Sequence, residues 1–422
     1  MSTTVMFIGL AVFLAHFLAL QFRHTNVPDV LVLVLLGMLV GPVLGLVAPD
    51  DFGKVGPIIA TIALVVILFE SGTSLDLQTL RDSMGTTGVL TFGSFVLTAL
   101  LVAGSGASLF GLDPLAAAML GVTLGGTASA VVIPLVASMR LGVKPATVLV
   151  LESVLTDVLC IVGVFALLQV AAQGQLDAGR LVGSVLSAFV FAAVIGAAGG
   201  VGWLFVLVRV RGFPNTISST LAYVFIVYGA TEFFGFSGAI AALSLGVTLG
   251  NFERLGIERM AGRGPRLEPL SAEDLSFFRE AVFLLKTYFF VYLGISIRFA
   301  DLRLTLLVLA MVVAVFVMRL LLVRLVYRSP EFGLRDTAVT SIMAPKGLAA
   351  AVLATLPLQY GVAGGETIRD VAYVAVLISI ALTALLVIVL PWRPVTRLYG
   401  TLLGKPPDPR ADEPVAPGGT GS

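Results

Sequence analysis

Long runs of apolar residues alternate with short clusters of charged residues, prolines and glycines along almost the whole chain. A helix of about 20 residues is long enough to cross the roughly 30 Å hydrocarbon core of a bilayer, and most of these runs approach or exceed that length. The clusters between the runs predict thirteen spans, near residues 3–22, 27–49, 55–75, 85–110, 114–138, 145–172, 180–208, 214–234, 236–251, 275–297, 303–327, 335–357 and 367–391. The pattern therefore predicts an all-α polytopic membrane protein.

The composition agrees with this prediction. Of the 422 residues, 58% are apolar and 12% are charged, whereas about 25% are charged in an ordinary soluble domain. Lysine and arginine gather in cytoplasmic loops, so they also test the span count. With the N-terminus outside, 18 of the 26 basic residues fall on the cytoplasmic side, 5 fall outside and 3 lie within spans. This asymmetry supports thirteen spans and a cytoplasmic C-terminus.

Two spans carry residues that interrupt a helix. The fifth contains the run 123–129 (TLGGTAS) and Pro134, and the twelfth contains the run 345–347 (PKG). Broken backbone is tolerated in a membrane only where protein or a water cavity satisfies the freed polar groups. If the seventh span is a connector, each break lies in the fifth helix of a six-helix half, which is the inverted-repeat plan of secondary transporters. The alternative is that glycine and proline are simply common in membrane helices.

This plan predicts a membrane transporter domain over residues 1–402. The first repeat covers 3–172, the connector 180–208 and the second repeat 214–391. The tail, 403–422, is rich in proline, glycine and aspartate and is expected to be disordered in the cytoplasm. The glycines Gly37, Gly41 and Gly45, spaced four residues apart, predict close packing of the second span on a neighbouring helix.

Ionisable residues inside spans are the candidate functional residues, because an acid or a lysine at the bilayer centre costs on the order of 2.5 to 3.5 kcal/mol. In the sixth span, Ser153 and Asp157 share one helix face, whereas Glu152 lies on another face with Thr156. A hydroxyl beside a carboxylate suits a hard monovalent cation, which prefers oxygen ligands. Glu152 needs a cationic partner, and we expect Lys346 to be that partner, since two unpaired buried charges would cost more than a pair.

Three further charged residues lie nearer the predicted span ends. Glu70 is either a solvated end residue or a group that gives ions access to the site. Arg319 and Glu232 are expected to reach the lipid headgroups. The single cysteine, Cys160, and the two histidines exclude a disulfide framework and leave almost nothing for a zinc enzyme. A net charge of +1 argues against a nucleic-acid partner.

Several segments resemble signatures of the cation/proton antiporter superfamily, and most of all its prokaryotic sodium/proton antiporter branch. They are VPDVLVLVLLGMLVGPVLGL at 27–46, LFESGTSLDLQTLR at 68–81, ESVLTD at 152–157, FFVYLG at 289–294 and APKG at 344–347. The resemblance covers nearly the whole membrane part of the chain. In this order the five segments are specific, although each alone is weak.

The resemblance implies that Asp157 binds either a proton or the transported cation. Further cation ligands would come from two serines, one acid and a backbone carbonyl near a threonine: Ser153, Ser129, Glu70 and Thr127. It also implies a structural ion pair between Glu152 and Lys346.

The expected function is a secondary active antiporter that exchanges Na⁺ for protons by alternating access and contributes to pH homeostasis. One titrating acid per cycle favours an electroneutral exchange. The alternatives are a K⁺/H⁺ antiporter and a sodium- or proton-coupled carrier of a small organic anion. We expect no enzymatic activity and no cofactor, because the transported ions are cargo. The resemblance further implies a homodimer in the cell membrane of a prokaryote.

Overall fold

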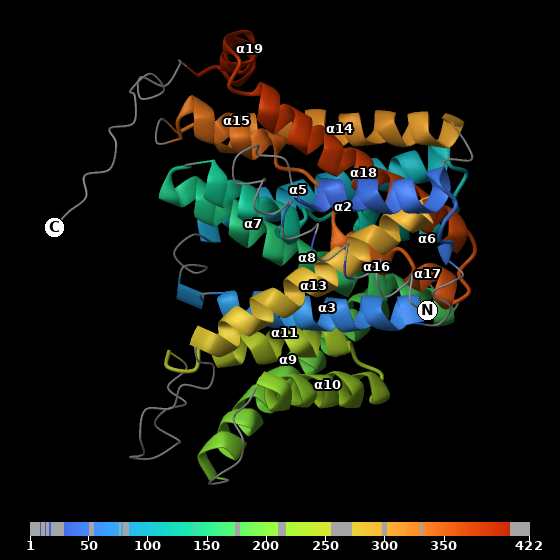
Figure 1. Cartoon of the computed structure of the whole chain (residues 1–422), viewed down its shortest axis with the longest axis vertical. Helices are drawn as coiled ribbons and strands as arrows, with labels where there is room; N and C mark the ends of the chain where they lie inside the picture. Colours follow the sequence, from blue (N-terminus) through green and yellow to red (C-terminus); the bar gives the residue numbers. More distant parts are fainter. Residues whose placement is uncertain are drawn as a thin grey trace, which may run out of the picture.

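The computed structural model describes residues 29–49, 55–75, 77–78, 84–139, 141–173, 178–209, 217–254, 272–297, 302–329 and 332–405, and the single residues 9, 13 and 17. These residues form helices and no β-strand (Figure 1). In chain order the helices are α2 (Asp29–Met38), the π-helix η1 (Leu39–Val43), α3 (Val55–Ser74), α5 (Met84–Leu109), α6 (Pro114–Thr123), α7 (Ser129–Ser138), α8 (Val143–Gln173), α9 (Ala178–Arg209), α10 (Ile217–Phe233), α11 (Gly238–Gly250), α13 (Ala272–Ser296), α14 (Leu302–Val326), α15 (Leu334–Ile342), α16 (Leu348–Leu353), α17 (Leu356–Gln359), α18 (Gly365–Val389) and α19 (Arg393–Leu403).

All of these helices except α19 lie within or within a few residues of the intervals predicted from the apolar runs. The first predicted span, 3–22, lies almost wholly outside the described residues. By length and apolar composition alone, five of the described helices qualify as membrane spans: Thr87–Leu109, Lys144–Ala172, Val190–Leu207, Leu302–Val326 and Gly365–Val389.

The C-terminal segment differs from the prediction. Helix α19 continues to Leu403, which is buried, and Lys405 donates hydrogen bonds to the backbone carbonyls of Ser329 and Phe332. The expectation that disorder begins at 403 is therefore wrong for these first residues, because they pack on the bundle. The rest of the tail, 406–422, lies outside the described residues.

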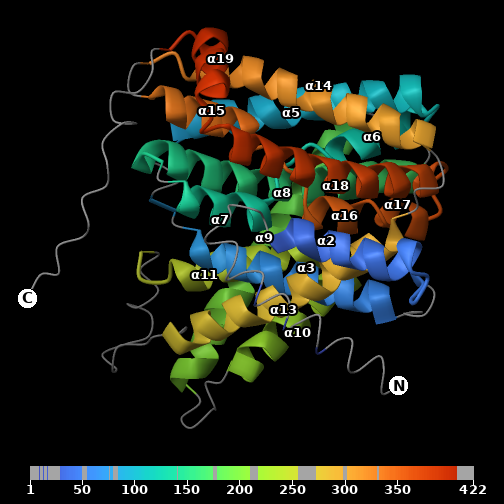
Figure 2. The ribbon, with the colours of Figure 1, turned by 45° about the horizontal axis from the view of Figure 1, so that its top comes forward.

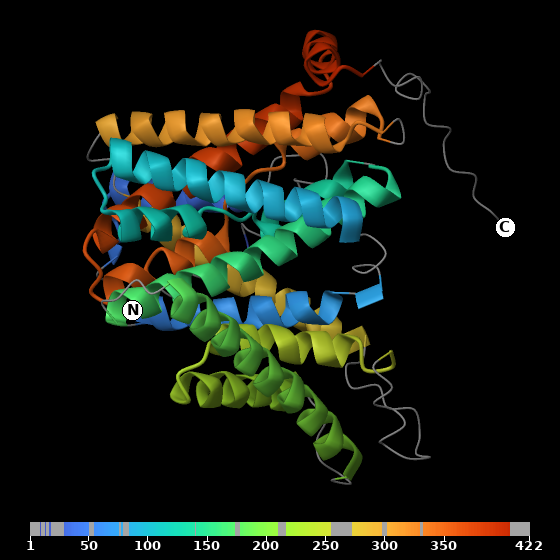
Figure 3. The same ribbon diagram turned by 180° about the vertical axis from the view of Figure 1, so that it is seen from behind.

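Most of the long helices lie side by side with their axes roughly parallel or antiparallel, and α19 crosses them (Figures 1 and 2). The buried apolar residues form a large cluster that includes α6, α7, α8, α15, α16 and α18. A second cluster joins α3, α9, α10, α11 and one residue of α13, Phe278. Figure 3 shows α9 and α10 on the outer side of this second group.

Glycines allow the closest helix contacts. A Cβ atom on Gly37 of α2 would lie 2.1 Å from the Val291 carbonyl oxygen of α13, and one on Gly41 would lie 2.8 Å from Ile295 Cα. The predicted close packing is thus confirmed for these two glycines and wrong for Gly45, which has a φ of +62° and no neighbour within 4 Å of an added Cβ.

Both predicted breaks are present, and they lie against each other. Residues 124–128 separate α6 from α7, and residues 343–347 separate α15 from α16. The Ala128 amide donates to the Pro345 carbonyl oxygen at 2.7 Å. An added Cβ on Gly347 would lie 2.4 Å from the Ala128 Cβ, so the two chains cross in direct contact.

We predict that Gly246→Ala lowers the thermal stability of the purified protein. A Cβ there would lie 2.2 Å from the Phe69 carbonyl oxygen of α3, and such overpacking typically costs about 1 to 3 kcal/mol in the free energy of unfolding. The matched control is Gly229→Ala in α10, where nothing lies within 4 Å. Equal melting temperatures of the two variants in detergent would contradict this account of the α3–α11 contact.

Candidate functional site

The candidate site lies where the middle of α8 passes the break between α6 and α7. Helix α6 begins at Pro114, with Asp113 capping it by accepting hydrogen bonds from the Leu115 and Ala116 amides. It ends at Thr123, just before a pair of glycines. One of them, Gly126, has no room for a side chain, because an added Cβ would lie 2.8 Å from Cys160 Sγ of α8. The glycine therefore lets the broken chain approach α8 closely.

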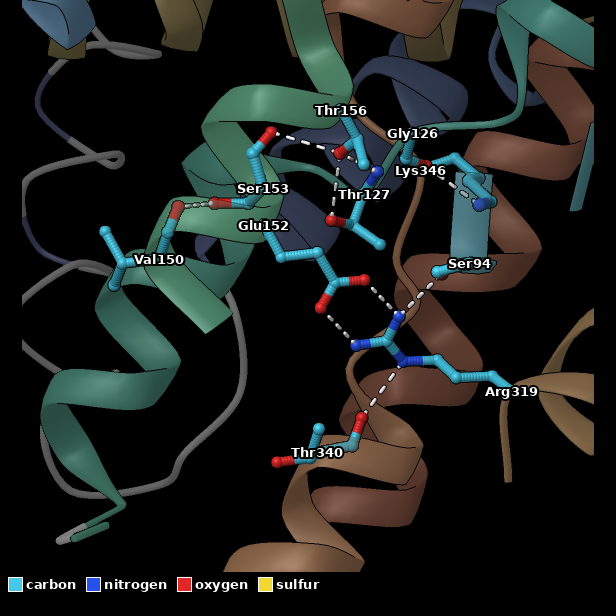
Figure 4. A network of polar contacts seen from close by, with 10 residues as sticks. All are labelled: Ser94, Gly126, Thr127, Val150, Glu152, Ser153, Thr156, Arg319, Thr340 and Lys346. Atoms are coloured by element: carbon cyan, nitrogen blue, oxygen red, sulfur yellow. Dashed lines mark hydrogen bonds and ion pairs between the residues drawn. The ribbon is translucent and has the colours of Figure 1, made fainter. Parts of the chain in front are cut away.

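Threonine side chains attach the break to α8. The Thr127 amide donates to Thr156 Oγ1 at 3.1 Å, and the two threonine hydroxyls lie 3.4 Å apart (Figure 4). Thr156 Oγ1 in turn donates to the Ser153 carbonyl oxygen at 3.2 Å. The freed backbone amide is thereby satisfied inside the protein, as a break at membrane depth requires.

Asp157 is bound to the other side of the break. Its carboxylate accepts a hydrogen bond from Ser129 Oγ, at the first residue of α7, at 2.9 Å. The side chain is half-buried, and in the part of the chain that the structure describes no lysine or arginine forms an ion pair with it. A carboxylate with a hydroxyl partner and no fixed countercharge can bind a proton or a hard monovalent cation.

The other predicted cation ligands make different contacts. Ser153 Oγ donates to the Val150 carbonyl oxygen of its own helix at 2.8 Å. The Glu70 carboxylate accepts from Ser74 Oγ at 3.4 Å and lies within electrostatic reach of Arg279. The structure thus joins Ser129 to Asp157 directly, and no hydrogen bond among the described residues joins Ser153, Thr127 or Glu70 to that carboxylate.

Glu152 pairs with Arg319 of α14, and the predicted pair with Lys346 is wrong. Arg319 Nη1 lies 2.6 Å from Glu152 Oε1, and Nη2 lies 2.9 Å from Oε2 (Figure 4). Arg319 also donates to Ser94 Oγ of α5 and to the Thr340 carbonyl oxygen of α15, each at 3.0 Å. The planar guanidinium forms two parallel hydrogen bonds to the two carboxylate oxygens, a bidentate geometry that a lysine ammonium cannot reproduce.

The expectation that Arg319 reaches the headgroups is also wrong, since the residue is only 1% exposed. The signal available in the sequence was its position between two uninterrupted apolar stretches, 306–318 and 320–323. Glu232 is half-buried, and its Oε1 accepts from the Gly238 amide at 2.7 Å, which fastens the start of α11.

Lys346, in the second break, forms a hydrogen bond to the first break. Its Nζ donates to the Gly126 carbonyl oxygen at 2.8 Å (Figure 4). Its backbone amide donates to Ser379 Oγ of α18, also at 2.8 Å. The ammonium group thus binds a backbone carbonyl of the first break, which has no partner within a helix. Among the described residues, no group of three His, Cys, Asp or Glu side chains is arranged to hold a metal ion.

Comparison with known proteins agrees with this fold. The family model described as "Sodium/hydrogen exchanger, transmembrane" matches residues 9–390. The chain is 27% identical to the K(+)/H(+) antiporter NhaP of Alkalimonas amylolytica over 392 residues, which cover 90% of this chain and 64% of that protein. It is also 27% identical to the Na(+)/H(+) antiporter NhaS2 of Synechocystis sp. over 286 residues, which cover 67% of this chain and 50% of that protein. The chain therefore matches only part of each relative's length.

A solved structure is similar over almost its whole length. The sodium proton antiporter MjNhaP1 from Methanocaldococcus jannaschii at pH 8 superposes with a TM-score of 0.73 at 20% sequence identity. The match covers 92% of this chain and 98% of that one, so the two share a fold.

We predict that Arg319→Met destabilises the protein by about 3 to 5 kcal/mol, because it leaves the buried Glu152 carboxylate unpaired. The double variant Glu152→Leu with Arg319→Met should be more stable than Arg319→Met alone, since no uncompensated charge remains. Thermal unfolding of the purified variants measures both effects. Arg324→Met, at an exposed position of the same helix, is the control and should behave like the wild type. Additive losses in the double variant would contradict the pairing.

Proposed function

Because the chain belongs to the transmembrane sodium/hydrogen exchanger family, we propose that it exchanges Na⁺ for protons by alternating access, with Asp157 as the group that carries either ion. Members of this family are cation/proton antiporters, which are secondary transporters and not enzymes. The cation and the proton are substrates of the exchange, and the proposal requires no cofactor.

The partners of the Asp157 side chain are the observation that carries the proposal. Three ionisable side chains lie buried around the crossing of the two breaks, and each of them is fixed: Glu152, Arg319 and Lys346. Asp157 differs because its hydrogen-bond partner is a neutral hydroxyl, that of Ser129. Ser129 could remain beside the carboxylate whether it holds a proton or a cation, since a hydroxyl can both donate and accept.

We propose that the cation is bound by the Asp157 carboxylate and Ser129 Oγ, with Ser153, a carbonyl near Thr127 and Glu70 completing the oxygen shell. Ser153 lies one helical turn from Asp157 on the same face of α8. Thr127 lies in the break between α6 and α7, two residues before Ser129, which is the first residue of α7. Glu70 would act through water, because its direct contact is with Ser74.

Competition for one carboxylate couples the two ions. An unneutralised carboxylate is costly to move through a low-dielectric region. The protein therefore changes between its outward-facing and inward-facing states when a proton or a cation neutralises Asp157. The change of state with an empty, charged site is thereby suppressed. This also suppresses the flow of one ion without exchange for the other.

We propose thirteen spans in two inverted six-helix repeats, with the limits expected from the sequence for the repeats, 3–172 and 214–391, and for the connector, 180–208. The transporter domain extends to 405 instead of 402, because Leu403 and Lys405 pack on the bundle. Under this scheme α2 corresponds to α11 and α3 to α13. The close contact of Gly37 with α13 then corresponds to that of Gly246 with α3, and both glycines would place a Cβ within 2.2 Å of a backbone oxygen. The two broken helices correspond in the same way.

The proposal includes a homodimer in the cell membrane, with the N-terminus outside, the C-terminus in the cytoplasm and a role in pH homeostasis. The first few spans and the seventh and eighth spans would form the dimer contact. The seventh and eighth spans are α9 and α10, and both expose large apolar side chains: Phe205 of α9 is 63% exposed and Ile226 of α10 is 65% exposed.

A K⁺/H⁺ antiporter is the second candidate, because the relative NhaP of Alkalimonas amylolytica is named as one. A carrier of a small organic anion is less favoured. It would need a cationic group available to the solute, whereas Arg319 and Lys346 are both engaged with protein oxygens.

We predict that Asp157→Asn abolishes cation–proton exchange. The amide keeps the shape of the carboxylate and a hydrogen bond to Ser129, but it cannot take up a proton. Everted vesicles with a pH-sensitive dye measure the exchange on addition of Na⁺, K⁺ or Li⁺. Asp370→Asn is the control, because that carboxylate pairs with Arg369 away from the site. Full activity of Asp157→Asn would overturn the assignment.

We also predict that the exchange is electroneutral, since one titrating carboxylate exchanges one cation for one proton. The initial rate of Na⁺ uptake into proteoliposomes should then be unchanged by an imposed membrane potential of either sign. A rate that follows the potential would contradict the one-for-one exchange and would favour proton carriage by Lys346 as well.

A further inference from the structure

A cavity of about 240 Å³ lies at the end of the bundle opposite to the start of α15. Its walls come from the last turns of α8, the residues around the connection between α10 and α11, and Tyr360, which directly follows α17 at the right-hand end of the bundle in Figure 1. The lining side chains that bear oxygen are Gln169, Glu232, Ser237 and Tyr360. In the proposed orientation this end of the bundle is the outer one.

The chemistry of the walls favours a cation. They contain one acid, Glu232, and no lysine, arginine or histidine. Glu232 Oε1 accepts from the Gly238 amide, and Oε2 has no hydrogen-bond partner among the described residues. Oxygen ligands around a single negative charge suit a hard monovalent cation that keeps part of its water shell.

Gln169 provides an independent observation. Its Oε1 atom is buried, yet it has no hydrogen-bond partner in the described part of the chain. A buried carbonyl oxygen without a partner is costly, so such an oxygen marks a place where an ion or a water molecule belongs. Gln169 lines the same cavity as Glu232.

The cavity also lies along the helix that carries Asp157. Gln169 is twelve residues beyond Asp157 in α8, which corresponds to about 18 Å along the helix axis. Between them, Ile161 and Val164 are apolar and no more than 1% exposed. A packed apolar section thus separates the cavity from the site in this conformation.

We propose that this cavity is an outer vestibule in which Glu232 and Gln169 bind the monovalent cation before it reaches Asp157 or after it leaves. The inference rests on the proposed antiport and adds a second cation site to it. Glu232 supplies the charge and Gln169 supplies a neutral oxygen. The binding is weaker than at Asp157, because the cation keeps part of its water.

The test compares uptake of radioactive Na⁺ from each side of the membrane. Glu232→Gln removes the charge and keeps an oxygen that can accept from the Gly238 amide, so the start of α11 is preserved. In right-side-out vesicles this variant should raise the KM for Na⁺ by about three- to tenfold, the loss expected from one partly screened charge. In everted vesicles the KM should stay at the wild-type value, and kcat should be unchanged in both.

Two further variants sharpen the test. Gln169→Glu adds a second carboxylate to the cavity and should lower the KM from the outer side. Glu366→Gln removes an exposed acid at the start of α18, outside the cavity, and should leave both values unchanged.

The outcomes separate the two proposals. Wild-type protein that shows no exchange in either kind of vesicle would overturn the antiport itself. If the wild type exchanges ions but Glu232→Gln keeps its outer KM, the vestibule is overturned and the antiport is not. A change that is equal from both sides, or confined to everted vesicles, likewise contradicts the vestibule.

Discussion

The structure depends on one constraint: polar groups at membrane depth must be satisfied inside the protein, since lipid offers them no partner. Two broken helices expose such groups in the middle of the bundle, and each break satisfies the other. The Ala128 amide donates to the Pro345 carbonyl, and the Lys346 ammonium donates to the Gly126 carbonyl. Neither break would be tolerated without its counterpart, so the crossing fixes the positions of α7, α8, α16 and α18 around it.

The same constraint divides the buried charges into two kinds. Glu152 and Arg319 neutralise each other, and the guanidinium also binds α5 and α15, so four helices meet at one ion pair. Breaking such a pair would be costly, which suits a group that holds the structure together during transport. Asp157 has only the Ser129 hydroxyl. Under the proposed function, Asp157 is the group that changes its partner, and the single hydroxyl contact allows this without breaking the Glu152–Arg319 pair.

The sequence was sufficient for the helices, because the length of an apolar run is a local property, and for both breaks, because glycine and proline interrupt a helix locally. Ser129 was expected near Asp157 only from the family resemblance, because the two residues are 28 apart in the sequence and belong to different helices. The partner of Glu152 was not predictable from residue type, since three cations were available within the spans. The depth of each charged residue in the membrane would have helped to identify the partner of Glu152. Glu152 is nine residues from the start of α8 and Arg319 is seven from the end of α14, which places them at similar depths of about 14 and 11 Å.

The distribution of close contacts indicates where the molecule can move. Glycine contacts with backbone atoms join α2 to α13 and α3 to α11, and the second apolar cluster adds α9 and α10 to this group. Polar contacts join α5, α8, α14 and α15 through Arg319, and the crossing adds α7, α16 and α18. Each group is thus held by contacts that do not tolerate sliding. We therefore expect alternating access to displace one group against the other, carrying Asp157 with the second group while its ion-pair network stays intact.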